Sequence, residues 1–150
     1  MPEHIEDSVG IVIVSHGDLG QALLRAAEFI LGQQYDCAAI SITTTLDVSE
    51  TVARLNDAAN RLDNGAGVLV LTDMFGGNPT NIALSLLGKH NVEVVTGVNL
   101  PMLLKVFSHR AEPLYALAET ARKAGSDGIV VAGSMLNQRA KKAKQSEAKQ

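Results

Sequence analysis

The stretch GVLVLTDMFGGNP, residues 67–79, decides the fold of this chain. Its apolar run from 67 to 72 is typical of a short strand buried on both faces, as in parallel sheets covered by helices. Residues 73–77 are expected to form a loop. Asn78 is then expected to cap a helix with Pro79 at its first position, where a missing N–H costs nothing. The stretch therefore predicts a strand, a loop and a helix in immediate succession.

Strand-like and helix-like segments alternate along the rest of the chain. The strand-like runs lie at 9–14, 37–43 and 92–96, the helix-like ones at 19–31, 49–64, 101–109 and 114–124, and a last strand-like piece at 128–132. Repeated strand–helix units imply parallel strands joined by right-handed crossovers. We therefore predict an α/β fold with an open, mainly parallel four-stranded sheet in the order 2-1-3-4 and helices on both faces.

The composition is that of one globular domain. The 150 residues are 46% hydrophobic, 19% charged and 3% aromatic, so a core of Val, Ile, Leu and Ala is expected. Cys37 is the single cysteine, which excludes an intramolecular disulfide and a thiol-rich metal cluster. We divide the chain into an N-terminal tail (1–8), a domain (9–133) and a basic C-terminal tail (134–150).

Charge is unevenly distributed along the chain. Residues 139–150 carry five basic side chains and one acidic side chain, a balance of +4, and the total of −3 leaves −7 for the remainder. Nucleic acids require neutralisation by Lys and Arg, so the acidic body argues against nucleic acid as a partner. The basic tail is interpreted as a solvated, frayed terminus rather than as a binding arm.

The sequence predicts a cytoplasmic protein. The N-terminal residues MPEHIEDSVG are acidic and polar, unlike a secretory signal. The longest apolar runs, at 11–14, 68–71 and 129–132, are far too short to span a bilayer. Any contact with a membrane is therefore expected to be indirect, through other proteins.

Two ionisable residues, His16 and Asp73, directly follow the first and third predicted strands. In open α/β sheets, ligands bind beyond the carboxyl ends of the strands, where the strand order reverses. If those two strands are neighbours, both side chains enter one crevice. The carboxylate can then fix the tautomer of the ring, leave the other ring nitrogen free as a nucleophile, and stabilise the positive charge of a phosphorylated ring.

Glycines beside these residues offer backbone N–H groups. Gly17 precedes the first helix, and Gly76 and Gly77 precede the third. Helix N-termini with flexible glycines are good cradles for phosphate. Asp18 is interpreted as a helix cap, because a carboxylate that faced a phosphoryl group would repel it. On geometry alone, a loop histidine and a turn aspartate would explain the same residues, so both interpretations stay open at this point.

No metal or nucleotide site is expected. His4, His90 and His109 are dispersed, whereas a metal needs converging ligands, and we interpret all three as structural or solvated. The nucleotide-binding patterns GxxxxGK(S/T) and GxGxxG do not occur in the sequence. If the crevice handles phosphate, the group is therefore expected to arrive from another protein rather than from bound ATP, and no cofactor is required.

Three blocks of sequence resemble enzyme IIA of the mannose family of the bacterial phosphoenolpyruvate-dependent sugar phosphotransferase system. They are GIVIVSHG at 10–17, the opening stretch at 67–79 and VTGVNLPM at 95–102, and the resemblance covers about residues 8–133. The resemblance implies that His16 takes a phosphoryl group from the phosphocarrier protein HPr and passes it to a histidine of enzyme IIB. It also implies that Asp73 supports this histidine, that Gly76 and Gly77 form the family's glycine loop, and that Asn99 borders the site.

The resemblance further implies a homodimer in which a C-terminal strand, here 129–132, reaches the partner's sheet. Asn78 stands where the family often has serine, so a side-chain contact to the phosphoryl group is expected to differ. The chain stops soon after the last expected strand. We therefore expect either a separate IIB partner or a regulatory protein, in which the phosphorylation state of His16 controls partner binding.

Two other functions are compatible with the same crevice. A related phosphocarrier subunit feeds a dihydroxyacetone kinase, with the same chemistry and a different acceptor. A small-ligand-binding domain of flavodoxin-like architecture would use the crevice without chemistry, but it would leave the pair of His16 and Asp73 without a purpose. The sugar cannot be inferred, because in this system selectivity lies in the membrane subunits.

Overall fold

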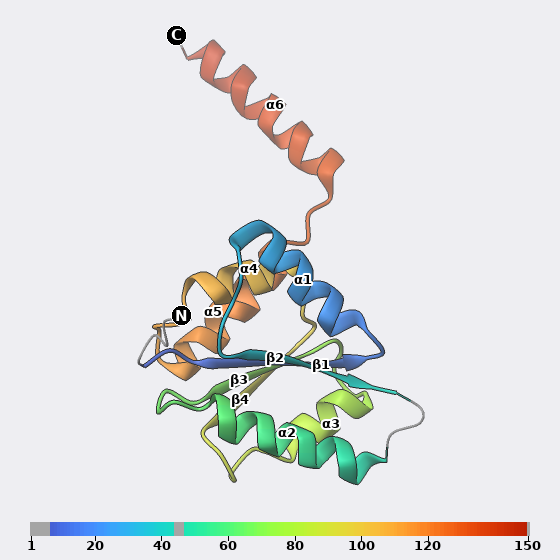
Figure 1. Ribbon diagram of the computed structural model, residues 1–150. Coiled ribbons are helices and arrows are strands. Elements are labelled where there is room, and N and C mark those ends of the chain that lie inside the picture. The colour runs from blue at the N-terminus through green and yellow to red at the C-terminus, as the bar shows by residue number, and fades with distance from the viewer. Residues whose placement is uncertain (1–6, 44–46, 150) are drawn as a thin grey trace.

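The fold is an open parallel sheet with helices on both faces, as a computed structural model describes for residues 7–43 and 47–149 (Figure 1). The strands are β1 (Gly10–His16), β2 (Cys37–Ile42), β3 (Val68–Thr72) and β4 (Val92–Thr96). They are parallel and lie in the order β2-β1-β3-β4, which confirms the predicted sheet. The predicted N-terminal tail, with His4, lies outside the described residues except for Asp7 and Ser8.

Helices cover the two faces of the sheet unequally. One face is covered by α1 (Leu19–Leu31), α4 (Leu100–Ser108) and α5 (Leu114–Asp127), and the other by α2 (Val48–Leu62) and α3 (Asn78–Leu84). Each face has a hydrophobic cluster of its own, which the sheet separates from the other. The molecule is therefore a sandwich of three layers, with the sheet in the middle.

Strand β1 shows why the decisive apolar runs do not alternate with polar residues. Ile11 and Ile13 point into the cluster under α1, α4 and α5, whereas Val12 and Val14 point into the cluster under α2 and α3. All four side chains are buried. A buried aliphatic side chain stabilises the fold by about 1.5–3 kcal/mol, so the four together contribute roughly 6–12 kcal/mol before chain entropy is subtracted. Neighbouring strands also flank β1 on both edges.

The strand register brings the two predicted site residues together. Val14 of β1 lies opposite Thr72 of β3. His16 comes two residues after Val14, and Asp73 comes one residue after Thr72, so both emerge at the carboxyl edge of the sheet. In the order β2-β1-β3-β4 this edge includes the reversal point of the chain, where ligands bind in open α/β sheets.

Arg110 closes the opposite, amino edge of the sheet. Its guanidinium donates hydrogen bonds to the backbone carbonyl oxygens of Val9 (2.9 Å), Asp36 (2.8 Å) and Tyr35. It also lies 5.9 Å from the centroid of the Phe107 ring. The side chain therefore ties the segment after α4 to the residues that precede β1 and β2.

The C-terminal segment differs from its prediction. Residues 129–131 form no strand in the single chain, and Ala132 already begins helix α6 (Ala132–Ala148). A strand needs a neighbour to bond with, and the prediction placed that neighbour in a second subunit, so strand exchange stays a prediction. The tail is helical rather than frayed, because Ala, Lys and Gln are strong helix formers. It is solvated, as interpreted, since α6 stands away from the body without a buried residue.

Two helices also begin differently from the prediction. Asp47, rather than Ser49, caps α2, because its carboxylate accepts the backbone N–H of Ser49 at 3.3 Å and the Ser49 hydroxyl at 2.7 Å. Gly77, rather than Asn78, occupies the cap position of α3. In both cases the residue that was expected to cap lies inside the helix.

Candidate active site

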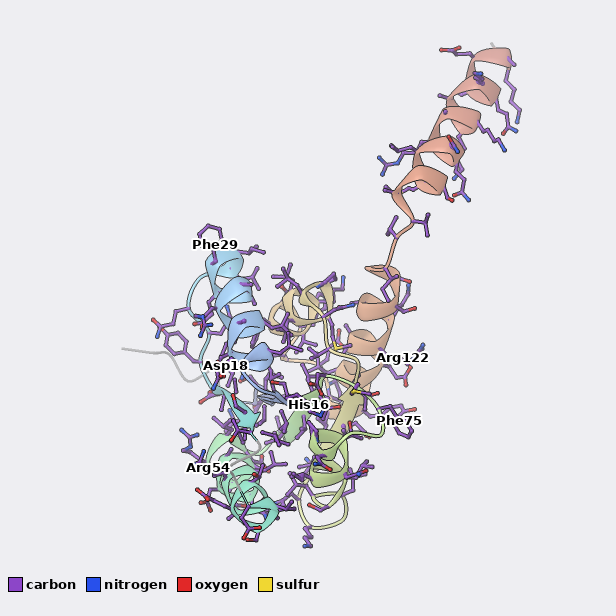
Figure 2. All side chains as sticks on the ribbon, turned by 90° about the vertical axis from the view of Figure 1, so that its right-hand side faces the viewer. His16, Asp18, Phe29, Arg54, Phe75 and Arg122 are labelled. Atoms are coloured by element: carbon purple, nitrogen blue, oxygen red, sulfur yellow. The ribbon has the colours of Figure 1, made fainter. Side chains whose placement is uncertain are left out.

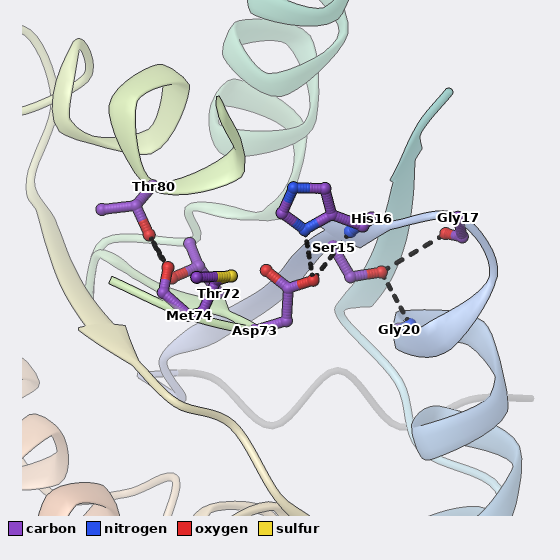
Figure 3. Close-up of polar contacts among 8 residues, drawn as sticks. All are labelled: Ser15, His16, Gly17, Gly20, Thr72, Asp73, Met74 and Thr80. Carbon is purple, nitrogen blue, oxygen red and sulfur yellow. Dashed lines mark hydrogen bonds and ion pairs between the residues drawn. The ribbon is translucent and has the colours of Figure 1, made fainter. Parts of the chain in front are cut away.

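His16 and Asp73 form a hydrogen-bonded pair at the carboxyl edge of the sheet (Figure 3). One carboxylate oxygen, Oδ2, accepts the backbone N–H of His16 at 2.9 Å and lies 2.8 Å from the ring nitrogen Nδ1. The side chain of Asp73 is 8% exposed and that of His16 is 53% exposed. The aspartate is thus a buried support, while the ring stands at the surface with its second nitrogen, Nε2, away from the carboxylate.

The charge of Asp73 sets the tautomer of the ring. Burial acts to raise the pKa of Asp73, but hydrogen bonds from the backbone and ring of His16, together with the ring's charge, outweigh it and lower the pKa. The carboxylate is therefore ionised at neutral pH and can only accept hydrogen bonds. Nδ1 must carry the shared hydrogen, so the neutral ring keeps its lone pair on Nε2, where a nucleophile needs it.

Ser15 holds the turn between β1 and α1. Its side chain is buried, and its hydroxyl oxygen accepts the N–H of Gly20 at 2.8 Å and lies 3.4 Å from the carbonyl oxygen of Gly17. This serine acts as the cap of α1, so Asp18, at the cap position, makes no side-chain cap hydrogen bond. The predicted capping role of Asp18 is therefore wrong. The missed signal was a hydroxyl directly before the histidine.

A threonine pair fixes the loop that carries Asp73. The hydroxyl of Thr80 donates to the carbonyl oxygen of Met74 at 2.5 Å and lies 2.7 Å from the hydroxyl oxygen of Thr72. Because a hydroxyl has one hydrogen, the bond to Met74 makes Thr72 the donor within the buried pair. The end of β3, the loop and the first turn of α3 are thereby joined. Neither threonine stood out in the sequence.

Gly77 lies against the reactive edge of the histidine ring. A methyl group on its α-carbon would lie 3.0 Å from Cε1 and 3.5 Å from Nε2 of His16. Its φ of −88° suits any residue, so the closeness of the ring, and not the backbone, disfavours a larger residue here. Gly76 differs, since its φ is +84° and the space around it is open. The backbone itself requires glycine at that position.

Two of the predicted phosphoryl contacts have other partners in the structure. The N–H of Gly17 donates to the carbonyl oxygen of Ile42 at 2.9 Å, which extends the pairing of β1 with β2. Asn99 caps α4: its Oδ1 accepts the N–H of Met102 at 3.0 Å, and its Nδ2 donates to the carbonyl oxygen of Gly125 at 3.0 Å. Their role as phosphoryl contacts stays a prediction that requires these bonds to break.

The remaining predicted residues lie as follows. Asn78 is the first residue of α3, directly after the glycine loop. Elsewhere, Nε2 of His90 lies 3.0 Å from Oδ1 of Asn56, and Nδ1 of His109 lies 2.9 Å from the carbonyl oxygen of Lys105. Within 7–43 and 47–149, no group of three or more His, Cys, Asp or Glu residues is arranged to hold a metal ion. No helix in those ranges is long and apolar enough to cross a membrane.

Exposed apolar side chains occur in the two segments that carry the pair. Met74 and Phe75, in the loop after β3, are 54% and 77% exposed, and Leu19 at the start of α1 is 47% exposed. In Figure 2, His16 lies between Asp18 on one side and Phe75 on the other. A half-exposed ring within an apolar rim is typical of a surface that meets another protein.

Proteins of related sequence belong to one transport system. The family model described as the fructose IIA component of the phosphotransferase system, EIIA-man, matches residues 10–123. A mannose-specific EIIAB component from Escherichia coli K12 is 33% identical over 125 residues, which are 81% of this chain and 39% of that protein. A fructose-specific EIIA component from Bacillus subtilis is 30% identical over 103 residues, which are 68% of this chain and 70% of that protein. The chain thus spans about two fifths of the length of the first relative.

A solved structure from the same system has this fold. The mannose/sorbose-specific IIA subunit from Enterococcus faecalis superposes with a TM-score of 0.77 and is 28% identical, covering 83% of this chain and 94% of that one. The match to the family model ends at residue 123, within α5. Helix α6 therefore lies beyond the residues that the family model matches.

Proposed function

The chain belongs to the EIIA-man family of the sugar phosphotransferase system, and on that premise we propose that it is a phosphocarrier that works through His16. In this proposal the ring accepts a phosphoryl group on Nε2 and passes it to a second protein. The observation that carries it is the distance of 2.8 Å between Nδ1 and the buried carboxylate of Asp73. That contact leaves Nε2 as the nucleophile at the surface.

The proposed transfer is a displacement at phosphorus. The lone pair of Nε2 attacks the phosphorus of a phosphohistidine on the donor, whose ring is protonated at its other nitrogen. The donor's N–P bond breaks, its electron pair returns to the donor ring, and that ring leaves as neutral imidazole. His16 becomes a phosphorylated cation that still donates its Nδ1–H to Asp73. Transfer to an acceptor histidine is the same step in reverse.

Asp73 supports both stages of this cycle. Before transfer it fixes the tautomer, and after transfer it compensates the positive charge of the phosphorylated ring. Its lowered pKa keeps it ionised throughout. We also propose that the backbone N–H groups of Gly76, Gly77 and Asn78 hold the phosphoryl oxygens, since the α-carbon of Gly77 adjoins the ring edge that carries Nε2.

We propose HPr as the donor and a separate enzyme IIB as the acceptor, in the cytoplasm, with the membrane reached only through permease subunits. The family match supports partners from the phosphotransferase system. The regulatory function and the dihydroxyacetone kinase subunit share the same first step. They differ from this proposal only in what happens to the phosphoryl group afterwards.

A homodimer with exchanged C-terminal strands is part of the proposal. Ile129, Val130 and Val131 are 77%, 52% and 73% exposed, although β-branched residues favour half-buried strands. Strand β4 is an edge of the sheet, so its outer side has no strand neighbour among the described residues. Pairing of residues 129–131 with β4 of a second copy would cover both.

The test supplies the full chain with phosphoenolpyruvate, enzyme I and HPr, and locates any acid-labile phosphoryl group by mass spectrometry. We expect one group on His16, and His16→Ala should lose it completely. The free energy of unfolding of His16→Ala should change by less than about 1 kcal/mol, because the side chain is exposed at a strand end. His90→Ala is the matched control and should accept normally. Normal acceptance by His16→Ala would contradict the proposal.

The acceptor is tested by a chase of the phosphorylated chain. Loss of the group to an added enzyme IIB supports the transport function. Loss only to the subunits of a dihydroxyacetone kinase would assign the chain to that enzyme instead. Retention with both acceptors favours the regulatory function.

A further inference from the structure

Asp18 has an unused carboxylate at the rim of the site. It occupies the cap position of α1, but the hydroxyl of Ser15 accepts the N–H of Gly20 in its place. The Asp18 side chain is exposed, and the described residues offer it neither a hydrogen bond nor an ion pair. An exposed carboxylate two residues from the nucleophile is therefore free to bind something that approaches from outside.

The segments that follow the four strands carry negative charge, and Arg122, which lines a cavity with Val95 and Thr96 of β4, is paired with Glu119 at 3.0 Å. The segments after the four strands are 15–20, 42–49, 73–80 and 97–101, and they contain three aspartates, Asp18, Asp47 and Asp73, but neither Lys nor Arg. Arg54, on the nearby helix α2, pairs with Glu50 of the same helix at 3.1 Å. Sites that handle phosphoryl groups usually neutralise them with Lys, Arg or a metal ion. Here that charge has to come from elsewhere.

A second observation concerns the buried aspartate. Its Oδ1 is buried and has no hydrogen-bond partner in the part of the chain that the structure describes, while Oδ2 makes both contacts with His16. The carboxylate of Asp73, 8% exposed, is thus stabilised by the backbone and ring of His16 and by its own backbone N–H, and by neither Lys nor Arg among the described residues. Together with Asp18 it gives the site a negative potential, which repels a free phosphate anion and attracts a cation.

We propose that Asp18 is a specificity-determining residue that binds a Lys or Arg on the docking face of the phosphoryl donor protein. This inference rests on the phosphocarrier function proposed above. The donor's cation neutralises the phosphoryl group in transit, and Asp18 holds that cation in place. Small phosphoryl donors bring no cation and are repelled by the same carboxylate. Met74 and Phe75, both more than half exposed, supply the apolar part of the contact with the donor protein.

Two phosphoryl donors, one a protein and the other a small molecule, distinguish binding of the donor's cation from repulsion of the phosphoryl group. One is phosphorylated HPr, and the other is phosphoramidate, whose P–N bond breaks as the bond from phosphorus to Nε2 forms, so that ammonia leaves with the electron pair. We expect Asp18→Asn to slow acceptance from HPr about 3- to 10-fold at low salt, and to speed acceptance from phosphoramidate about 2- to 4-fold. Asp18→Lys should enlarge both changes. Asp57→Asn, the same change of charge at an exposed position of α2, should alter neither rate.

Salt provides a further readout, because exposed charges are screened. In about 0.5 M salt the difference between the wild type and Asp18→Asn with HPr should become small. Rates that change in the same direction with both donors would show that Asp18 is only structural, and an unchanged rate with HPr would equally overturn the inference. A folded wild type that accepts from neither donor refutes the phosphocarrier function itself, which is a different result.

Discussion

The two edges of the sheet each carry a basic side chain near one end of β1, and they use it in opposite ways. At the amino edge, all three guanidinium nitrogens of Arg110 donate to backbone carbonyl oxygens. At the carboxyl edge, His16 uses Nδ1 to contact Asp73 and leaves Nε2 at the surface. A basic group whose nitrogens all bind backbone oxygens stabilises the fold. A basic group that binds through only one of its nitrogens keeps another nitrogen free for chemistry.

The same contrast separates residues within the carboxyl edge. Asn99 lies in a block that resembles the family's site, yet both ends of its amide are bound to backbone groups. Asp18 looked like a structural cap, yet its carboxylate makes no cap hydrogen bond. A residue's place in a motif therefore does not show whether its role is structural. A side chain whose polar atoms are all bound within the fold is structural, and one with an unpaired polar atom is available for function.

Arg110→Met tests the structural side of the comparison and has the largest expected effect. It keeps a long side chain but removes three charged hydrogen bonds, although the carbonyl oxygen of Asp36 still accepts the N–H of Ile11 and that of Tyr35 is exposed to water. A buried acceptor without a donor, here chiefly the carbonyl oxygen of Val9, costs about 1–3 kcal/mol. The free energy of unfolding should fall by about 2–4 kcal/mol in a urea titration, while the folded fraction accepts phosphoryl groups normally. Arg122→Met, which breaks an exposed ion pair with Glu119, is the control and should cost less than about 1 kcal/mol. An equal loss of unfolding free energy in Arg110→Met and Arg122→Met would contradict the structural role assigned to Arg110.

Asp73→Asn tests the functional side and should have an intermediate effect. Asparagine keeps an oxygen for the N–H of His16 but removes the charge that fixes the tautomer and compensates the phosphorylated ring. We expect the initial rate of acceptance in a quenched-flow experiment to fall about 10- to 100-fold, or roughly 1.4–2.7 kcal/mol in the barrier. Asp57→Asn is again the control. A wild-type rate would leave Asp73 with a structural role only.

The same variant should also change how stability depends on pH. The pKa of Asp73 is lowered from its ordinary value of 3.8, so the ionised form stabilises the fold. That contribution is complete above the ordinary value and is lost as the pH falls through the lowered one. As the pH falls below about 5, Asp73→Asn should therefore lose less stability than the wild type in urea titrations. Parallel losses would contradict the lowered pKa.

The adjacent residues Gly76 and Gly77 test the same distinction between structural and functional residues, with the smallest expected effects. Gly77→Ala places a methyl group 3.0 Å from Cε1 of His16, so the ring must turn away. Acceptance should slow about 3- to 10-fold, with stability nearly unchanged. Gly76→Ala forces a φ of +84° on alanine, which should cost about 1 kcal/mol in the free energy of unfolding with little change in rate. If Gly77→Ala instead lowers the free energy of unfolding and Gly76→Ala instead slows acceptance, the roles assigned to the two glycines are reversed.

The sheet was predictable because its central strands are buried on both faces. The runs at 11–14 and 68–71 contain no polar residue, and short runs of this kind between loop signals favour parallel strands. Once β1 and β3 are parallel neighbours, the residues that follow them lie at the same edge of the sheet, however the helices pack. His16 and Asp73 were therefore predictable together with the fold.

The contacts that complete the site were not predictable, because hydroxyl groups carry no periodic signal. Ser15, Thr72 and Thr80 acquire their roles only through the positions of the helices that follow them. Helix α6 was not predicted, for a different reason. Packing against the body usually decides between strand, helix and coil, and α6 has no buried residue to decide it.

The position of β1, between two strands and under helices on both faces, has a consequence for motion. In native-state hydrogen exchange, such a strand belongs to the unit that opens only when the whole domain unfolds. The backbone of the histidine at its end is therefore expected to stay in place when a partner binds. For the proposed transfer, a partner therefore has to bring its own reactive group to Nε2 in the correct orientation, because the backbone that carries His16 does not move toward it.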